Sequence, residues 1–509
     1  MKSLVNSRHL SEIADTLSSR AFYIRSPLHE WGLVYEASSC MKNQIGSSTI
    51  QRLRDCTHIW HLESSGSARG GYTHSRYTAV TDWIAALDAQ SNVVVIPPLK
   101  AQKAKMAPPF RADQIGSLLR PQELLGARKS VASPSQMYDR SQDDSLIAEA
   151  EASAVHWAVQ QQLSQGIRPL TSGEYTRHIF YGGFFETLEG MKAEPELPIP
   201  QAFRSDFPTT EGLRAMGAKT RAAVVCTGPI RWRRSAYLRE WELVCAALGG
   251  KGLKNQVKIT LPAPSYQHIQ LKAGTAWTAE SGYDVGGDEA YFDDLAAAYR
   301  AEIMALYGAG CRNVQIDDPC MTYFADQHFL RGLEKDGTDA EELLDLYLRA
   351  QNKIFQGLPE DLHTGVHLCR GNMSASTHWV TGSYEAIAEK LFNRTKYHTY
   401  FLEFDNVESQ GGFAPLRFLP KGKNVVLGLV STKRAELEDV EALVARIKQA
   451  AEVVAGAQGV SQEEAFDYLA VSPQCGFSSS SLAGGKGMTM ERMWEKLQLV
   501  QDVASKVWS

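Results

Sequence analysis

The chain has 509 residues, which is more than one ordinary domain requires, and its 44% hydrophobic and 22% charged residues exclude wholesale disorder and collagen-like or coiled-coil architectures. The formal charge of -5, from 53 basic and 58 acidic residues, leaves no net basic field to bind nucleic acid or an anionic membrane. No apolar run approaches the ~18–20 residues of a membrane-spanning helix. The eight cysteines are widely spread, which favours free thiols in a reducing, cytoplasmic compartment over a disulfide framework.

Residues 1–105 differ in character from the rest of the chain. Serine and threonine are scattered through them, helical periodicity is brief, and Val93–Ile96 is the one good strand candidate. We expect 1–105 to be an N-terminal extension, disordered or non-native, because the regular α/β pattern begins only after Met106. An independent small domain is the alternative. The second predicted domain is 106–509.

After Met106, short apolar runs alternate with amphipathic stretches, which is typical of a parallel sheet covered by helices. The candidate strands are Gln114–Ser117, Ile167–Thr171, Val257–Leu261, Asn313–Asp317, Thr364–Cys369, Thr399–Phe404, Asn424–Val430 and Tyr468–Ser472. The clearest helices are Asp288–Tyr307, Ala340–Gln356, Glu436–Val454 and Met490–Val503. Eight strands with helical crossovers predict an α/β fold of the (β/α)8 TIM type, with Ala222–Cys226 as a ninth strand outside the barrel. The alternative, an open doubly wound sheet, lacks the Gly-x-Gly-x-x-Gly fingerprint of a dinucleotide site.

Polar residues that are unfavourable to bury occur at the carboxyl ends of three predicted strands. In (β/α)8 barrels the catalytic residues lie at these strand ends. His367 and Cys369 are two residues apart, so both side chains point to the same face of their strand. Glu403 interrupts an apolar strand, and Cys475 comes just after the last one. Each has an ordinary explanation: a core cysteine beside a hydrogen-bonded histidine, a buried ion pair, and a small residue before Gly476.

Together these four residues are ligands of the types that zinc accepts, and their dispersion over separate strand ends favours a catalytic ion over a structural one. Zn²⁺ with two thiolates and one carboxylate has a formal charge of about -1. Such an electron-rich site is suited to holding an incoming thiol as a nucleophilic thiolate. The residues therefore point to alkyl transfer to a thiol.

Six segments of the chain, in the right order, resemble the C-terminal half of cobalamin-independent methionine synthase, in the methionine synthase/uroporphyrinogen decarboxylase-like superfamily. They are Gln114–Pro121, Ser172–Arg177, Val314–Pro319, Thr364–Arg370, Tyr400–Asp405 and Val471–Phe477. The resemblance begins near residue 108 and leaves 1–105 uncovered; that stretch is too short for the first of the two barrels in the full-length enzymes.

The resemblance implies a zinc-binding barrel that transfers a methyl group from 5-methyltetrahydrofolate polyglutamate to homocysteine. It implies four zinc ligands: His367, Cys369, Glu403 and Cys475. It also implies that Ile115, Gly116 and Ser117 hold the carboxylate of the amino acid, with Glu174 and Asp317 facing its ammonium group. Ordinary explanations exist here too, since Glu174 fits a strand-to-helix turn and Asp317 an Asp-Asp-Pro turn.

Two positions depart from the family pattern. Lys433 stands where the family has a histidine proposed to handle a proton, and a lysine would need a lowered pKa for that task. His268 stands where the family stacks a tryptophan on the pterin, and its smaller ring stacks less well. Both departures weaken the folate assignment while leaving zinc and a thiol acceptor in place.

Three other functions compete with methionine synthesis. A thiol methyltransferase with a different methyl donor is the strongest of them. A uroporphyrinogen decarboxylase would share the barrel but would not need the four zinc-type ligands. A non-catalytic zinc-binding barrel is the remaining possibility, and the acidic candidates Glu174 and Asp317 argue against it.

Overall fold

The computed structural model describes residues 107–128, 145–215, 217–371, 378–480 and 486–508, and the backbone of two short strands nearer the N-terminus. The chain divides into two units, Met1–Ala104 and Lys105–Ser509. In the first unit, β1 (Ile24–Arg25) pairs with β2 (Trp31–Gly32) in antiparallel fashion. The prediction that 1–105 is an extension concerns residues that otherwise lie outside the described ranges.

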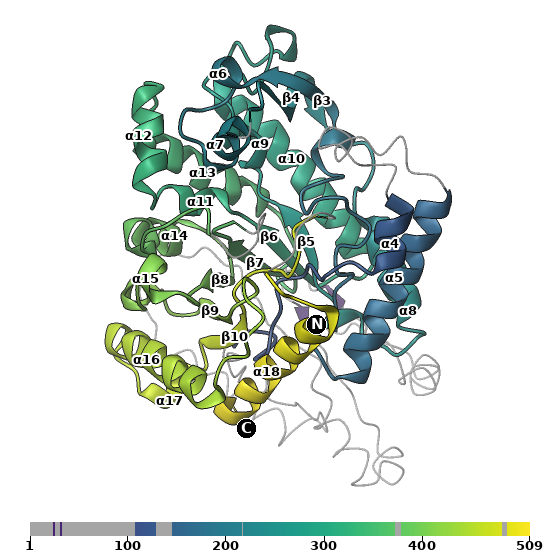
Figure 1. The fold of residues 1–509 in the computed structure, drawn as a ribbon, viewed down its shortest axis with the longest axis vertical. Helices are drawn as coiled ribbons and strands as arrows, with labels where there is room; N and C mark the ends of the chain where they lie inside the picture. Colours follow the sequence, from purple (N-terminus) through teal and green to yellow (C-terminus); the bar gives the residue numbers. More distant parts are fainter. Residues whose placement is uncertain are drawn as a thin grey trace, which may run out of the picture. The chain divides into compact units, whose positions relative to one another are not determined.

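A ring of parallel strands forms the centre of the second unit (Figure 1). Six of them are hydrogen-bonded in chain order: β5 (Ile259–Pro262), β6 (Asn313–Asp317), β7 (His363–Leu368), β8 (Thr399–Glu403), β9 (Asn424–Val430) and β10 (Leu469–Pro473). Single parallel bridges add the first two predicted strands and close the ring, pairing Ala112 with Val471, Ser117 with Gly173, and Leu170 with Val257. The (β/α)8 barrel is thereby confirmed, and the open-sheet alternative is wrong.

Helices surround this ring, and the four that the sequence marks most clearly are all present (Figure 1). They are α10 (Gly287–Gly308), α13 (Ala340–Ile354), α16 (Val440–Gln458) and α18 (Met490–Trp508). In α10, apolar residues recur every four positions from Tyr291 to Ile303, and this stripe, which predicts a helix from the sequence, is buried along its length. Helix α16 begins four residues later than predicted because the side chain of Asp439 accepts a hydrogen bond from the backbone N–H of Ala442 and caps the helix.

The remaining α-helices are shorter or lie in the first half of the barrel. They are α4 (Gln122–Ala127), α5 (Ser145–Ser164), α6 (Ile199–Ala202), α7 (Pro208–Ala215), α8 (Leu238–Ala247), α9 (Tyr266–Gln270), α11 (Cys320–Tyr323), α12 (Gln327–Lys335), α14 (Ala388–Arg394), α15 (Val407–Gln410) and α17 (Gln462–Phe466).

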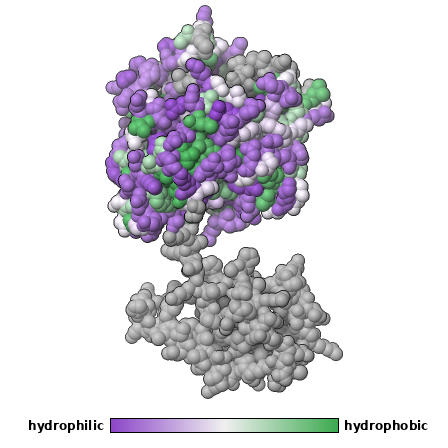
Figure 2. Space-filling view, turned by 60° about the horizontal axis from the view of Figure 1, so that its bottom comes forward, coloured by the Kyte–Doolittle hydropathy of each residue, from purple (hydrophilic) through white to green (hydrophobic). Residues whose placement is uncertain are grey.

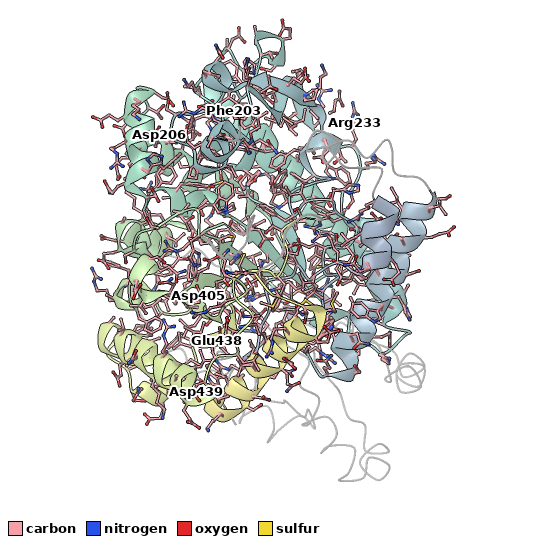
Figure 3. All side chains as sticks on the ribbon, in the orientation of Figure 1. Phe203, Asp206, Arg233, Asp405, Glu438 and Asp439 are labelled. Atoms are coloured by element: carbon pink, nitrogen blue, oxygen red, sulfur yellow. The ribbon has the colours of Figure 1, made fainter. Side chains whose placement is uncertain are left out.

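A two-stranded antiparallel sheet stands outside the barrel, between its second and third strands. It pairs β3 (Glu189–Pro198) with β4 (Thr220–Arg231), and β4 contains the predicted ninth strand. The sequence did not predict β3, because its charged residues and two prolines lack the apolar alternation of a strand. Asp206, which is labelled in Figure 3, lies between β3 and β4. It forms an ion pair with Lys335, the last residue of α12.

Hydrophilic side chains cover most of the described surface on the face shown in Figure 2, with apolar side chains in small groups between them. Within the described ranges, no helix combines the length and the apolar character that a membrane crossing requires.

We expect a chain that begins at Met106 to fold on its own. All eight strands of the barrel, including the bridge at Ala112, come after that residue, so the truncation removes no strand from the ring. Thermal unfolding of the truncated chain should be a single cooperative transition, measured by circular dichroism against the full-length protein. An insoluble or non-cooperative truncation would disprove the predicted domain boundary.

Candidate active site

The four candidate metal ligands meet at the carboxyl end of the barrel. His367 is near the end of β7, Cys369 follows β7, Glu403 is the last residue of β8, and Cys475 lies two residues beyond β10. Each offers one ligand atom, and these atoms all lie within 4.8 Å of one another. His367, Glu403 and Cys475 are buried and Cys369 is half-buried. Parallel strands end at one rim, which explains how residues a hundred positions apart converge.

Several polar atoms of this cluster have no hydrogen bond to another described residue. They are both ring nitrogens of His367 and the Oε2 atom of Glu403, whose side chain is fully buried. Leaving such groups buried and unpaired costs about 1–3 kcal/mol each. A cation among them would remove that cost.

The two thiols are close enough to share a proton. Their sulfur atoms are 3.2 Å apart, and the hydrogen bond between them lowers the pKa of Cys369 to about 6. The same interaction raises the pKa of Cys475. The pair therefore gives up one proton more readily than two separate thiols would, and a divalent cation would favour ionising both.

The turn after Cys369 fixes the geometry of the cluster. The backbone N–H of Arg370 donates to Glu403 Oε1 at 3.1 Å, and that of Gly371 donates to the sulfur of Cys369 at 3.2 Å. The buried ammonium of Lys433 donates to the carbonyl of Gly371. A Cβ on Gly371 would lie 2.4 Å from the ring of Trp379, and its φ of +101° also favours glycine.

The donor set fits zinc. Two soft sulfur ligands, one imidazole nitrogen and one carboxylate oxygen are the ligand types of four-coordinate zinc, whereas magnesium and calcium prefer oxygen alone. A bound metal would satisfy one ring nitrogen of His367 and the Oε2 atom of Glu403, which make no hydrogen bond to a described residue, and would hold the two thiols as thiolates.

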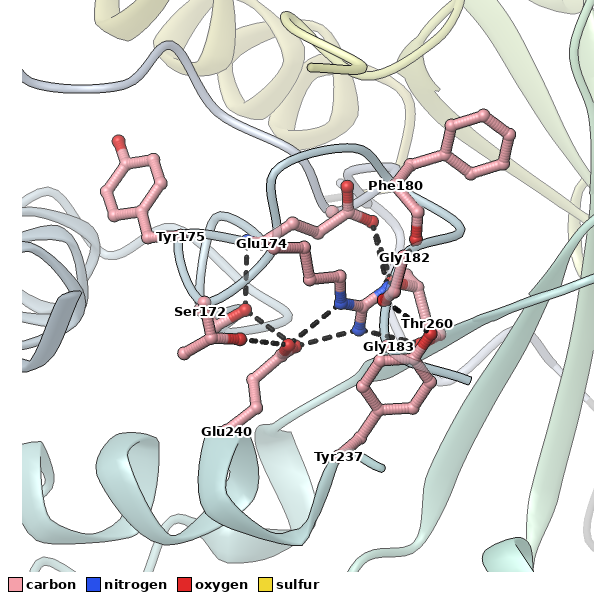
Figure 4. Close-up of polar contacts among 12 residues, drawn as sticks. Ser172, Glu174, Tyr175, Phe180, Gly182, Gly183, Tyr237, Glu240 and Thr260 are labelled. Carbon is pink, nitrogen blue, oxygen red and sulfur yellow. Dashed lines mark hydrogen bonds and ion pairs between the residues drawn. The ribbon is translucent and has the colours of Figure 1, made fainter. Parts of the chain in front are cut away.

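Glu174 lies at the end of the second barrel strand in a network of buried charges (Figure 4). Its Oε1 accepts a 2.7 Å hydrogen bond from Thr260 and is 3.7 Å from the guanidinium of Arg177. Glu240 binds Arg177 through both carboxylate oxygens and also accepts from Ser172, whose oxygen receives the backbone N–H of Glu174. This network holds Glu174 at a φ of 59°, an unusual conformation for a residue other than glycine.

One oxygen of Glu174 remains without a partner. The buried Oε2 atom accepts no hydrogen bond from the described residues, and burial raises the pKa of this carboxyl. Asp317, the last residue of β6, is also buried. Its pKa is raised to about 7, first by burial and then by the negative charge of Glu174. Two neighbouring buried carboxylates of this kind suit a ligand that carries a positive charge.

The carboxylate of Asp317 brings this acidic pair next to the candidate metal ligands. Asp317 is the register partner of His367 in the β6–β7 ladder, so the two residues lie at the same level of the rim. A ligand with an ammonium group at Asp317 and a thiol a few bonds away would reach the cluster without leaving this end of the barrel.

Ile115, Gly116 and Ser117 lie between the two sets of residues. The side chain of Ile115 packs inside the barrel with Phe401, so the backbone of this segment is what a ligand could reach. A Cβ on Gly116 would lie 2.8 Å from the methyl carbon of Thr260, and its φ is +141°. Ser117 accepts a hydrogen bond from the N–H of Phe477, two residues beyond Cys475.

The structure also shows residues that the sequence did not single out. The Nδ1 atom of His378 is 3.5 Å from Glu403 Oε2 and its Nε2 atom is 3.9 Å from Asp405. No sequence pattern marks His378, because it reaches the site from the long loop after β7. Gln315 also contacts Asp317. The sequence could have indicated this contact, because residues two positions apart on a strand point to the same face.

His268 differs from its expected place at the pocket. It is 2% exposed, with Nδ1 hydrogen-bonded to the hydroxyl of Tyr347 at 2.9 Å and Nε2 3.1 Å from Asp288. Its ring therefore has no face available for stacking on a ligand in this conformation.

Comparisons with known proteins agree with this architecture. Residues 284–504 match the family model of the cobalamin-independent synthase catalytic domain. Protein YxjH of Bacillus subtilis (strain 168) is 33% identical over 411 residues, which are 80% of this chain and 97% of that protein.

Two solved structures extend the comparison over the barrel. A protein of Listeria monocytogenes assigned to the vitamin-B12 independent methionine synthases is 26% identical, with a TM-score of 0.56 over 79% of this chain and 99% of its own. The B12-independent methionine synthase of Shewanella sp. W3-18-1, solved with selenomethionine, is 17% identical, with a TM-score of 0.53 over 78% and 97% of the two chains. The second likeness concerns the fold alone.

We predict that the purified protein contains about one zinc ion per chain, since the four ligand atoms match a four-coordinate site. Cys475→Ser should lose most of the metal, because a hydroxyl is a far poorer zinc ligand than a thiolate. Elemental analysis after purification under reducing, zinc-supplemented conditions measures both. Cys311→Ser is the matched control, because Cys311 is also buried but lies outside the cluster. Equal metal content in all three proteins would rule the site out.

Proposed function

The chain belongs to the cobalamin-independent methionine synthase family, and from that premise we propose that it transfers a methyl group to the thiol of homocysteine to give methionine. One observation carries the proposal: a cluster of zinc-type ligands and the buried carboxylate of Asp317, which neighbours Glu174, lie at the same level of one barrel rim. The zinc ligands would be His367, Cys369, Glu403 and Cys475.

Zinc bound there would supply a positive centre at which an acceptor thiol is held in its nucleophilic, ionised form. The protein supplies the rest of the arrangement. The backbone N–H groups of Arg370 and Gly371 keep Glu403 and Cys369 in place for the metal. The buried Lys433 offsets part of the negative charge of the ligands: together with the hydrogen bond from His378 it lowers the pKa of Glu403.

The acidic pair would orient the amino acid. With the ammonium group of homocysteine between Glu174 and Asp317, and its carboxylate at the backbone of Ile115–Ser117, the side chain would extend toward the metal cluster. Recognition at three points of this kind would present the sulfur to the methyl donor in one geometry, which is a large part of the rate advantage that an enzyme can give.

The methyl donor is the less constrained part of the proposal. The resemblance to the family implies 5-methyltetrahydrofolate, but the buried ring of His268 is not available for stacking on a pterin. That observation favours including other donors, and a thiol methyltransferase with a different donor is the second candidate function.

The decisive experiment is an assay of the purified protein with homocysteine and a panel of methyl donors, with methionine detected by mass spectrometry. We expect methionine with one donor of the panel, no product after removal of the metal by a chelator, and recovery when zinc is restored. Product formation that is insensitive to the chelator would remove zinc from the proposal. The absence of methionine with every donor, from protein that contains zinc, would contradict the proposed reaction.

The Asp317→Asn variant should keep its zinc but bind homocysteine more weakly, because the substitution removes a negative charge that would face the ammonium group. A loss of about tenfold, equivalent to ~1.4 kcal/mol, is expected by titration calorimetry. The control ligand is 4-mercaptobutyrate, which is homocysteine without its ammonium group and should be affected much less.

The pH dependence tests the same contact. The pKa of Asp317 is raised to about 7, so its ionised fraction grows as the pH rises through that value. The preference for homocysteine over 4-mercaptobutyrate should therefore increase between about pH 6 and 8 in the wild type. In Asp317→Asn this increase should be reduced. An equal loss of affinity for both thiols would show that Asp317 stabilises the barrel and does not recognise the ammonium group of the substrate.

A further inference from the structure

A chain of buried polar side chains runs inside the barrel beneath Asp317. Gln315 is fully buried and lies two residues before Asp317 on β6, so both side chains point into the barrel. Its Nε2 atom donates to Asp317 Oδ1 at 2.7 Å and to the carbonyl of Ile115 at 2.8 Å. Gln315 therefore joins two segments that the proposed function places around the amino acid.

Lys258 determines which way the Gln315 amide faces. Its ammonium is 2.7 Å from Gln315 Oε1 and 2.8 Å from Asp113 Oδ1, and it also donates to the carbonyl of Gln114. An ammonium group has donors only, so the amide must turn its oxygen toward Lys258 and its NH₂ group toward Asp317. The side chains joined by these hydrogen bonds are each at least nine-tenths buried, so water does not compete for the hydrogen bonds. They are Asp113, Lys258, Gln315 and Asp317.

The carboxylate of Asp317 is consequently held by one oxygen. Gln315 occupies Oδ1, while among the described residues no hydrogen bond is made to Oδ2. A carboxylate that rotates freely would lose rotational entropy each time it bound a ligand. A carboxylate that is already fixed avoids this cost and presents the same oxygen to the pocket. Hydrogen bonds to charged groups are stronger than those between neutral groups, so the bond from Gln315 favours one orientation of this carboxylate.

We infer that Gln315, oriented by Lys258, is a positioning residue that sets the preference of this pocket for thiols carrying an ammonium group. The inference rests on the proposed function, because it concerns the same pocket. It adds that selectivity depends on the barrel interior below the rim, at a residue that need not touch the ligand.

The test substitutes Gln315→Met, which has a similar length but no hydrogen-bonding group, in the full-length, zinc-containing protein. Titration calorimetry with homocysteine and with 4-mercaptobutyrate gives two dissociation constants. We expect homocysteine to bind about tenfold more weakly and 4-mercaptobutyrate to change less than about twofold. Zinc content, measured in parallel, should stay the same.

Gln351→Met is the matched control. Gln351 is as deeply buried as Gln315 and donates its amide to Asp318, the residue next to Asp317. Asp318 faces α11 and not the pocket, since it accepts from the backbone N–H of Cys320. The control loses an equivalent buried bond, and its preference between the two thiols should match that of the wild type.

Three results would overturn the inference: equally weakened binding of both thiols in Gln315→Met, no change of either dissociation constant in that variant, or the same change of selectivity in Gln351→Met. Should Gln315→Met not fold, Gln315→Asn carries the test, because its shorter amide stays polar but draws back from Asp317; the same selective loss is expected. A wild-type protein that does not prefer homocysteine would contradict the proposed substrate itself, which separates failure of the function from failure of this inference.

Discussion

The register of parallel strands around a closed barrel is the constraint on which the rest of the site depends. Because every strand runs in the same direction, its last residue lies at the same rim as the last residues of its neighbours. Asp317 and His367 are register partners on β6 and β7, and Glu403 ends β8 one strand further on. A slip of one residue in any strand would turn these side chains out of the barrel, so the geometry of the site and the stability of the sheet are specified together.

Burial then determines the chemistry of the groups that the register brings together. Away from water, Glu174 and Asp317 have raised pKa values, whereas the hydrogen bond from Cys475 lowers the pKa of Cys369 against the opposing effect of burial. Each group is placed where an opposite charge on a ligand or metal would relieve a cost already built into the folded chain. The rigid supports of these groups are the backbone of Arg370–Gly371 and the buried pair of Arg177 and Glu240.

Much of this could be predicted from the sequence, and the failures have physical causes. The strands from Asn313 onward are short segments of mostly buried residues between amphipathic helices, and the sequence predicts their bounds to within one residue. The first two strands are predicted from the same alternation of apolar runs and amphipathic stretches, yet they join the sheet through single bridges, which the hydrophobic pattern does not reveal. Hydrophobic pattern carries no information on β3, whose pairing comes from its neighbour β4. Nor does the hydrophobic pattern predict the side-chain hydrogen bonds of Gln315 and His268, because their partners lie far away in the sequence.

Lys433 shows how a departure from the family pattern can be read physically. Its ammonium is buried and hydrogen-bonded to the carbonyl of Gly371, whose own N–H donates to the sulfur of Cys369. A lysine held in this way is poorly suited to carrying protons in and out of the site, which is the task proposed for the family's histidine. It is well suited to acting as a fixed charge. A zinc ion with two thiolates and one carboxylate has a formal charge of about -1, and one nearby ammonium brings the total to about zero. With zinc bound as proposed, the negative charge of an incoming thiolate would meet less repulsion in such a centre, and Lys433 would supply electrostatic support of the acceptor in place of a proton carrier.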